Sequence, residues 1–306
     1  MPASSALPAS EPTIGRGIAS MLLAVMVFST MDALIKWLAP RYPVMEIVFF
    51  RSVFGLMPLL PSLLREGSAP FRTRRPLGQA GRALIGLGAT VCFFYAYRFL
   101  PLADVFGIAF AAPLFVTALS VPLLGERVGI RRWSAVIVGF LGVLIMVRPD
   151  AGVADAATLI TLLGTVCYAI SLVFLRNLGK TETTVSIVFY VTCTTTLASA
   201  LTMPFVWVTP SAIDLPLLML VGIMGGVGQL AITRAFRLAP AAVIAPFDYT
   251  ALPYAAALGY FIWHDVPEPI FLLGAVIVIG SGLYILHRET RLARMPPPAV
   301  SVANEG

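Results

Sequence analysis

The sequence predicts an all-α integral membrane protein whose ten transmembrane helices form two inverted five-helix repeats. Three observations predict this fold class: an apolar composition, a series of long apolar runs, and a similarity between the two halves of the chain. Hydrophobic residues make up 58% of the 306 residues and charged residues only 12%, whereas soluble domains average about 45–50% and about 25%. This composition, with a mean hydropathy of +0.91, excludes a soluble enzyme and a disordered chain. The absence of alternating apolar and polar strands excludes an outer-membrane barrel.

Ten apolar runs are long enough to cross a bilayer, which requires about 20 residues. The first half contains runs at 17–38, 44–63, 81–100, 103–124 and 133–148. The second half contains runs at 156–176, 184–204, 215–237, 241–262 and 270–287. Because the first run has no evident small-residue cleavage site, we interpret it as a retained helix rather than a signal peptide. We expect residues 1–15 to form a disordered N-terminal tail and residues 290–306 a C-terminal tail.

The positive charges indicate how the helices are oriented. If the N-terminus lies in the cytoplasm and successive spans alternate, 16 of the 21 lysines and arginines fall on the cytoplasmic side. The exceptions are Lys36, Arg41, Arg51, Arg98 and Arg148. Cytoplasmic loops are enriched in these residue types, so the sequence predicts a multi-pass protein of the cell inner (plasma) membrane with both termini cytoplasmic. The same rule accounts for the net charge of +6, and we expect no nucleic-acid partner.

The two halves of the chain resemble each other at one constant offset. The matching positions include charged residues, glycine and proline: Arg98–Pro101 with Arg237–Pro240, Glu126 with Asp265, Phe50 with Phe189, and Gly86 with Gly225. Each predicted half, 16–152 and 153–289, contains five spans. Because five is odd, the second half must enter the membrane in the opposite orientation. Inverted repeats around a central site are a recurrent architecture of membrane transporters.

Several short motifs occur at equivalent places in the two halves. The first half carries Phe99-Leu100-Pro101-Leu102-Ala103, Ala112-Pro113-Leu114-Phe115, Leu124-Gly125-Glu126-Arg127 and Gly139-Phe140-Leu141-Gly142-Val143. The second half carries Leu238-Ala239-Pro240-Ala241-Ala242 and Leu273-Gly274-Ala275. As a set, these motifs resemble the EamA family of the drug/metabolite transporter superfamily. The resemblance covers nearly the whole chain and implies two EamA-like repeats and secondary transport of a small metabolite by alternating access. The second half departs from the family's Gly-Glu pair, since it reads His264-Asp265.

Three further segments resemble a subgroup of bacterial riboflavin importers: Asp32–Trp37, Phe49–Ser52 and Ala245–Thr250. This finer resemblance implies riboflavin uptake. Relatives with similar patterns transport S-adenosylmethionine, amino acids or amines, by import or export, so these substrates remain alternatives. A membrane enzyme or a channel is a remote alternative. We expect no enzyme, because Asp32 and Asp248 would lie near opposite faces of the bilayer and neither lies in a Gly-x-Gly-Asp motif.

Four charged residues of the first two spans are candidates for substrate binding, because ionisable side chains within the hydrocarbon are costly and usually functional. Asp32 and Lys36 lie four residues apart and share one helix face. Counting 1.5 Å per residue from the outer end of each helix places Asp32 level with Arg51, and Lys36 level with Glu46. The sequence therefore predicts two ion pairs that open toward the outside. They either only hold the two helices together, or the deeper pair contacts the substrate or couples protons.

Four more candidates lie in later spans: Tyr95, Gln229, Asp248 and Tyr249. The aromatic cluster around Tyr95 either stacks on a planar ligand or anchors its helix at the membrane interface. Gln229 lies among three glycines, which favours close helix packing with Gln229 as an interhelical hydrogen-bond donor. Asp248, which adjoins Tyr249, either pairs with Arg234 or Arg237 or acts as a protonatable or substrate-binding carboxylate.

The sequence indicates no cofactor, no metal site and no catalytic residue. The three cysteines, Cys92, Cys167 and Cys193, are scattered through apolar runs and lack metal-ligand spacing. The chain contains no phosphate-binding loop of the Walker type, so any transport is secondary. The expected partners are a small-molecule substrate, the lipid bilayer, and a proton or another coupling ion. We expect a monomer or a homodimer.

Overall fold

The computed structural model describes residues 11–67, 71, 73–124, 129–147, 153–178, 181–238 and 245–294. In these ranges the chain forms helices and no strand, which confirms the all-α class. The first half contains α1 (Glu11–Leu38), α2 (Val44–Gly55), η1 (Met57–Leu59), α3 (Leu60–Glu66), α4 (Pro76–Ala96), α5 (Leu102–Ala109), α6 (Ala112–Leu124) and α7 (Ile130–Val147). The second half contains α8 (Val153–Leu178), α9 (Thr184–Ala200), α10 (Met203–Val206), α11 (Asp214–Leu238), η3 (Ala245–Thr250), α13 (Ala251–Trp263) and α14 (Pro269–Arg294).

Prolines set several helix limits. Pro76 and Pro269 occupy the first position of α4 and α14, where the N–H that proline lacks would have no partner in the helix. Pro43 and Pro101 immediately precede α2 and α5. At the end of α13, His264 adopts a left-handed conformation with φ 60°, which turns the chain away from the helix axis.

Two of the expected spans are divided. The fourth expected span, 103–124, forms α5 and α6, and Pro113 lies in the first turn of α6. Proline cannot donate a helical hydrogen bond, so it favours such a break. The ninth expected span, 241–262, contains η3 and α13, while 241–244 lies outside the described residues. A broken helix is tolerated in a bilayer where its backbone is buried in protein or lines a cavity, and Ala111 and Ala112 at the α5–α6 break are buried.

Within the described residues, seven helices are long and apolar enough to cross a membrane: Ile14–Leu38, Val44–Arg65, Pro76–Ala96, Leu102–Pro122, Ala156–Leu175, Asp214–Ile232 and Pro269–His287. Two shorter apolar helices, Trp133–Met146 and Val185–Ala200, coincide with the fifth and seventh expected spans. The 13 residues of α13 reach only about 20 Å, against a hydrocarbon thickness of about 30 Å. The number of ten spans therefore stays a prediction. At the N-terminus α1 begins at Glu11, so residues 11–15 of the expected tail are helical.

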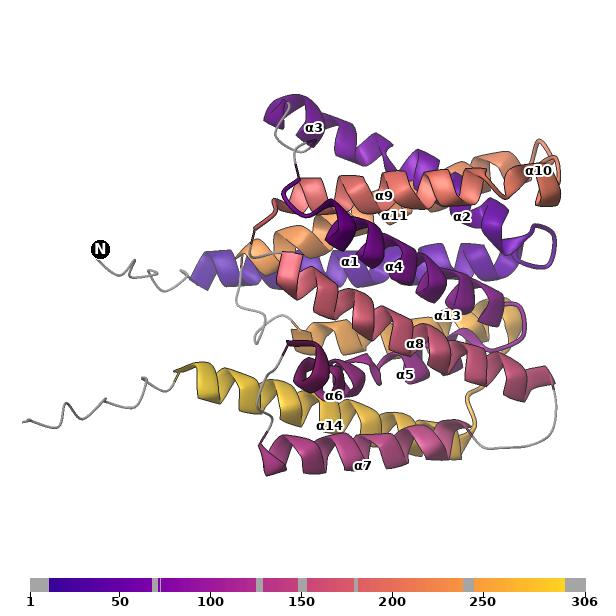
Figure 1. Ribbon diagram of the computed structural model, residues 1–306. Helices are drawn as coiled ribbons and strands as arrows, with labels where there is room; N and C mark the ends of the chain where they lie inside the picture. Colours follow the sequence, from indigo (N-terminus) through magenta and orange to yellow (C-terminus); the bar gives the residue numbers. More distant parts are fainter. Residues whose placement is uncertain are drawn as a thin grey trace, which may run out of the picture.

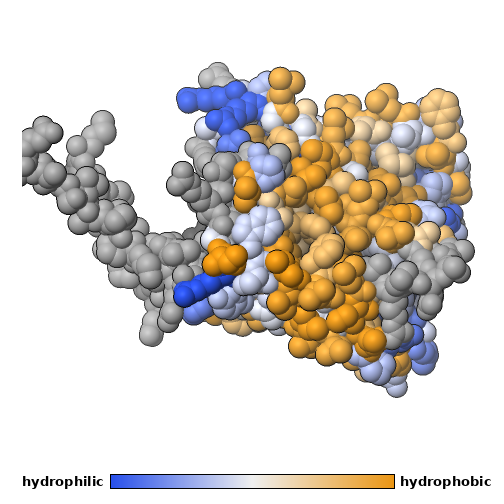
Figure 2. All heavy atoms as spheres, turned by 60° about the horizontal axis from the view of Figure 1, so that its bottom comes forward, coloured by the Kyte–Doolittle hydropathy of each residue, from blue (hydrophilic) through white to orange (hydrophobic). Residues whose placement is uncertain are grey.

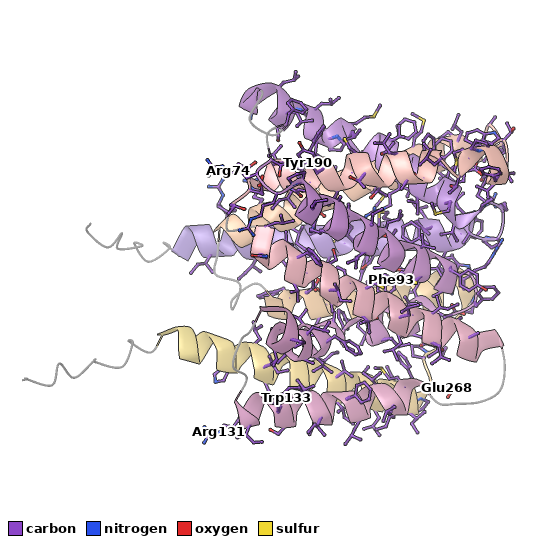
Figure 3. All side chains as sticks on the ribbon, viewed as in Figure 1. Arg74, Phe93, Arg131, Trp133, Tyr190 and Glu268 are labelled. Carbon is purple, nitrogen blue, oxygen red and sulfur yellow. The ribbon has the colours of Figure 1, made fainter. Side chains whose placement is uncertain are left out.

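The helices lie side by side and alternate in direction (Figure 1). The start of α1 and the end of α14 lie at the same end of the bundle, on the left in Figure 1, which we call the terminal end. Arg74 and Arg131 lie at the terminal end and Glu268 at the opposite end (Figure 3). The first helices of the two halves, α1 and α8, run in opposite directions (Figure 1), in agreement with an inverted repeat.

An apolar surface extends between the two ends on one side of the bundle. Figure 2 shows this surface on the side formed by α7 and α14, with hydrophilic residues gathered toward either end. Its large exposed side chains include Ile137, Leu141 and Leu144 of α7 and Leu272, Leu273 and Val276 of α14. A belt of this kind is what a bilayer requires of a multi-pass protein, and lipid chains rather than water are its natural solvent.

Most large contacts between helices have a counterpart in which each helix is replaced by the corresponding helix of the other half. In chain order, α1, α2, α4 and α7 correspond to α8, α9, α11 and α14. The contact of α1 with α11 thus has its counterpart in that of α8 with α4, and the contact of α2 with α11 has its counterpart in that of α9 with α4. The contacts α2–α9 and α7–α14 each join two corresponding helices, one from each half. The packing therefore has an approximate two-fold relation between the halves.

Glycines allow the helices of opposite halves to approach closely. A Cβ atom on Gly226 of α11 would lie 2.6 Å from the backbone oxygen of Gly55 of α2, and one on Gly274 of α14 would lie 2.7 Å from that of Gly142 of α7. Only a residue without a Cβ fits such contacts. The expectation that the glycines near Gln229 serve close packing is confirmed for Gly226.

Candidate functional site

A polar cavity lies between α2, α4, α9 and α11, with two of these helices from each half. Its volume is about 90 Å³. The lining residues are Arg51, Ser52, Gly55 and Leu59 near α2, Arg82 of α4, Val188, Val191, Thr192 and Thr195 of α9, and Gly225, Gly226 and Gln229 of α11. Two of the predicted substrate-binding residues, Arg51 and Gln229, thus line the same cavity.

Arg51 lies between the cavity and an acidic residue of α1. Its guanidinium carbon is 5.9 Å from the centroid of the Phe94 ring. Asp32, which is not among the lining residues, interacts with the Arg51 charge and with the hydroxyl of Tyr97, the residue that follows α4. The nitrogen and oxygen atoms of Arg51 and Asp32 lie more than 4.0 Å apart, since no ion pair joins them within that limit. The predicted pairing is therefore present as an electrostatic interaction and not as a direct contact.

Arg82 is a second cation of the cavity, whereas the apolar runs in the sequence predict it among the cytoplasmic charges. That assignment started the helix near residue 81, whereas α4 begins at Pro76. Arg82 therefore lies about 9 Å inside the helix at 1.5 Å per residue. Its Nε and Nη1 atoms are buried and have no hydrogen-bond partner among the described residues. Proline is common at the first position of a helix, so Pro76 was the signal in the sequence that could have placed Arg82 inside the helix.

The remaining polar groups of the cavity come from α2, α9 and α11. Thr192 donates a hydrogen bond of 2.8 Å to the backbone oxygen of Val188, which leaves its oxygen able to accept one. Gln229 makes no hydrogen bond to another described residue, so its expected interhelical bond is absent and its amide is available to a ligand. Ser52 and Thr195 complete this set. The cavity thus offers cationic and neutral hydrogen-bonding groups on an otherwise apolar wall.

The predicted pair of Lys36 with Glu46 is wrong. Lys36 instead forms an ion pair of 2.6 Å with Asp265, which lies between α13 and α14, and its Nζ lies 4.8 Å from the centroid of the Trp263 ring. Glu46 accepts a hydrogen bond of 3.0 Å from the backbone N–H of Val208. Both side chains contact the second half of the chain rather than each other.

The other predicted residues lie away from the cavity. Tyr95 is 36% exposed and its ring packs on Phe99 at 5.1 Å, so it faces outward. Tyr249 packs on Phe110 with ring centroids 5.0 Å apart. Asp248 forms no ion pair with Arg234 within 4.0 Å, and its expected alternative partner Arg237 has a side chain outside the described part of the structure.

Two ion pairs join described residues of the two halves at the end of the bundle opposite the terminal end. The first is the Lys36–Asp265 ion pair. In the second, Arg41 binds both carboxylate oxygens of Asp214 at 2.7 and 2.9 Å, and Tyr42 donates to the same carboxylate at 2.9 Å. At the terminal end, the contacts between described residues of the two halves include the hydrogen bond of Arg75 with Asn177 at 3.2 Å and the ring contact of Phe71 with Phe189 at 4.9 Å. Described residues of the two halves therefore contact each other at both ends of the bundle.

Sequence comparison identifies the class of protein. The EamA-like transporter family matches residues 15–148 and again residues 156–286, once in each half. The chain belongs to this family. It is a multi-pass membrane transporter and not an enzyme, in agreement with the expectation from its motifs.

Several curated relatives cover nearly the whole chain. The S-adenosylmethionine uptake transporter of Rickettsia bellii is 30% identical over 279 residues, which is 91% of this chain and 96% of the relative. The pseudopaline exporter of Pseudomonas aeruginosa is 32% identical over 86% of this chain and 93% of its own. The riboflavin transporter of Rhizobium johnstonii is 27% identical over 90% and 92%. A solved crystal structure with 18% identity matches with a TM-score of 0.62 over 91% of this chain and 99% of its own, which shows a shared fold.

Proposed function

We propose that this chain is a secondary transporter that moves a small metabolite across the cell inner membrane by alternating access. The observation that carries the proposal is the polar cavity between the two halves, lined by α2 and α4 on one side and by α9 and α11 on the other. Its volume of about 90 Å³ is below the roughly 300–1,000 Å³ of ligand pockets. Substrate must therefore enter when the halves part at one end, as in transporters built from inverted repeats.

Two specific substrates have support. Segments Asp32–Trp37, Phe49–Ser52 and Ala245–Thr250 resemble riboflavin importers, and a relative with 27% identity is named as a riboflavin transporter. S-adenosylmethionine is supported by relatives of 29% and 30% identity that are named for its uptake. Both molecules are too large for the cavity in its closed form, so its volume favours neither.

The test is uptake into liposomes that contain the purified protein, with radiolabelled S-adenosylmethionine and radiolabelled riboflavin assayed side by side. We expect uptake of one of them to saturate and to accelerate when liposomes are preloaded with the same unlabelled compound. Tyr95→Phe, at a side chain that faces outward, serves as a matched variant with unchanged uptake. Flux that does not saturate would indicate a channel, and conversion of the compound in detergent would indicate an enzyme. Either result, or no uptake and no binding of either compound, contradicts the proposal.

We also propose that the terminal end faces the cytoplasm. Arg74 and Arg131 lie at this end (Figure 3), as the bias of positive charge requires. In a chain whose three cysteines are replaced by alanine, a membrane-impermeant thiol reagent applied to intact cells should label Ala212→Cys. It should label Arg74→Cys only after the membrane is opened. Labelling of both positions in intact cells would contradict the orientation.

A further inference from the structure

We infer that Arg51 and Arg82 together bind a carboxylate group of the substrate. The charge of Arg82 is the reason why the substrate must carry an acidic group. The inference rests on the proposed transport function and names the chemical class of its substrate. It starts from the charge of the cavity wall, which contains both arginines and no acidic residue.

Arg51 and Arg82 differ in whether a nearby negative charge balances their positive charge. Asp32, which does not line the cavity, interacts with the charge of Arg51. Arg82 forms no ion pair within 4.0 Å with a described acidic residue, and its charge interacts with the neutral phenol of Tyr168. Among the described groups that interact directly with the two arginines, Asp32 is therefore the one carboxylate against two positive charges. A bound group with a single negative charge makes the site neutral, whereas an isolated buried charge is costly.

Unused hydrogen-bond donors support the same conclusion. The buried Nε of Arg51 and the buried Nε and Nη1 of Arg82 have no partner among the described residues. The other guanidinium nitrogens of both residues also form no hydrogen bond to the described chain. Because these atoms are not among the buried ones and both residues line the cavity, they are open to it. A guanidinium presents paired donors that match the two oxygens of a carboxylate.

The requirement for a carboxylate discriminates between the two supported substrates. S-adenosylmethionine carries an amino-acid carboxylate, which can take the position between the arginines, and its ammonium and sulfonium groups must then lie away from the two guanidinium groups. Riboflavin carries no acidic group and would leave Arg82 unbalanced. The amide of Gln229 and the hydroxyl of Thr192 lie on the same cavity wall and can bind further polar atoms of either molecule, so they do not discriminate.

The first experiment needs no substrate. Arg82→Gln keeps hydrogen-bonding capacity and removes the charge, so we expect the ligand-free, detergent-purified variant to melt at a higher temperature than the parent protein. Functional sites commonly hold such unfavourable groups at a cost in stability. Arg131→Gln removes an arginine at the terminal end and should leave the melting temperature unchanged. An unchanged or lower melting temperature of Arg82→Gln would mean that Arg82 serves structure, and would overturn the inference.

The second experiment tests the ligand class. S-adenosylmethionine at saturating concentration should raise the melting temperature of the parent protein, since a ligand that binds the folded state stabilises it. Decarboxylated S-adenosylmethionine should give no shift, and Arg82→Gln should lose the shift with S-adenosylmethionine while Arg82→Lys retains part of it. Equal shifts with both compounds, or a shift with riboflavin alone, would overturn the carboxylate site. Saturable riboflavin uptake in that case would leave the transport function standing, so the two failures are distinguishable.

Discussion

Asp32→Asn is expected to destabilise the protein and to reduce transport at least tenfold, because it leaves the Arg51 charge unbalanced. Removal of one partner from a buried charge pair costs about 3–5 kcal/mol. The charges of Asp32 and Arg51 lie more than 4.0 Å apart, so we expect the lower end of this range. The measurements are the melting temperature of the purified variant and its uptake in liposomes.

Two further variants separate charge balance from a general loss of structure. The double variant Asp32→Asn/Arg51→Gln removes both charges and should recover most of the stability, while transport stays low because Arg51 lines the cavity. Glu182→Gln changes a carboxylate near the terminal end, where Glu182 accepts a hydrogen bond from the Arg74 backbone, and should have a small effect on both measurements. If the loss of stability in the double variant equals the sum of the losses in the single variants Asp32→Asn and Arg51→Gln, the interaction is contradicted.

Lys36→Gln is expected to open the bundle at the end opposite the terminal end. Lys36 contacts Asp265 at 2.6 Å, with side-chain exposures of 12% and 26%, and Asp104 interacts with Lys36, Asp265 and Glu268. Without the lysine, three carboxylates face one another across the boundary between the halves and repel. A hydrogen bond to a charged group contributes about 1.5–3 kcal/mol, which corresponds to a change of about ten- to hundredfold in the ratio of open to closed forms.

This opening can be measured as the rate at which a membrane-impermeant thiol reagent labels Thr192→Cys in the cavity. The native cysteines are first replaced by alanine, and the reagent is applied from the side opposite the terminal end. Lys36→Gln should raise the labelling rate, whereas Lys36→Arg keeps the charge and should leave it low. The charge-exchanged variant Lys36→Asp/Asp265→Lys should restore slow labelling relative to Lys36→Asp. A rate that is the same in all variants would mean that this ion pair does not hold the end closed.

The sequence was informative where a single helix or a pair of adjacent helices decided the outcome. Residue counts along the first two spans placed Asp32 and Arg51 at one level, and the structure has them interact. The same counts placed Lys36 beside Glu46, but they carry no information on the direction around the helix axis. The partner of Lys36 is 229 residues further along the chain, where only the packing of the two halves brings it near.

The candidate site was harder to predict because small errors in helix limits change the role of a residue. A start at Pro76 rather than near residue 81 moves Arg82 from the membrane surface into the cavity wall. Tyr95 lies in the last turn of α4 and Tyr97 directly follows this helix, and the two side chains differ in exposure: Tyr97 is 5% exposed and Tyr95 36%. An aromatic cluster alone does not indicate which of its members points inward.

The exchange of helix contacts between the halves has a consequence for the direction of transport. If the helices of the first half pack in nearly the same way as those of the second half, the inward-open and outward-open conformations are close in backbone free energy. Their difference then depends on side-chain contacts such as the charged pairs of Lys36 and Arg41 at one end, and the hydrogen bonds of Arg75, Tyr190 and Glu182 at the other. A single substitution at either end can therefore shift the resting conformation without altering the scaffold. Such a balance is easily adjusted by mutation, and it offers a physical reason why one family contains relatives named for uptake and relatives named for export.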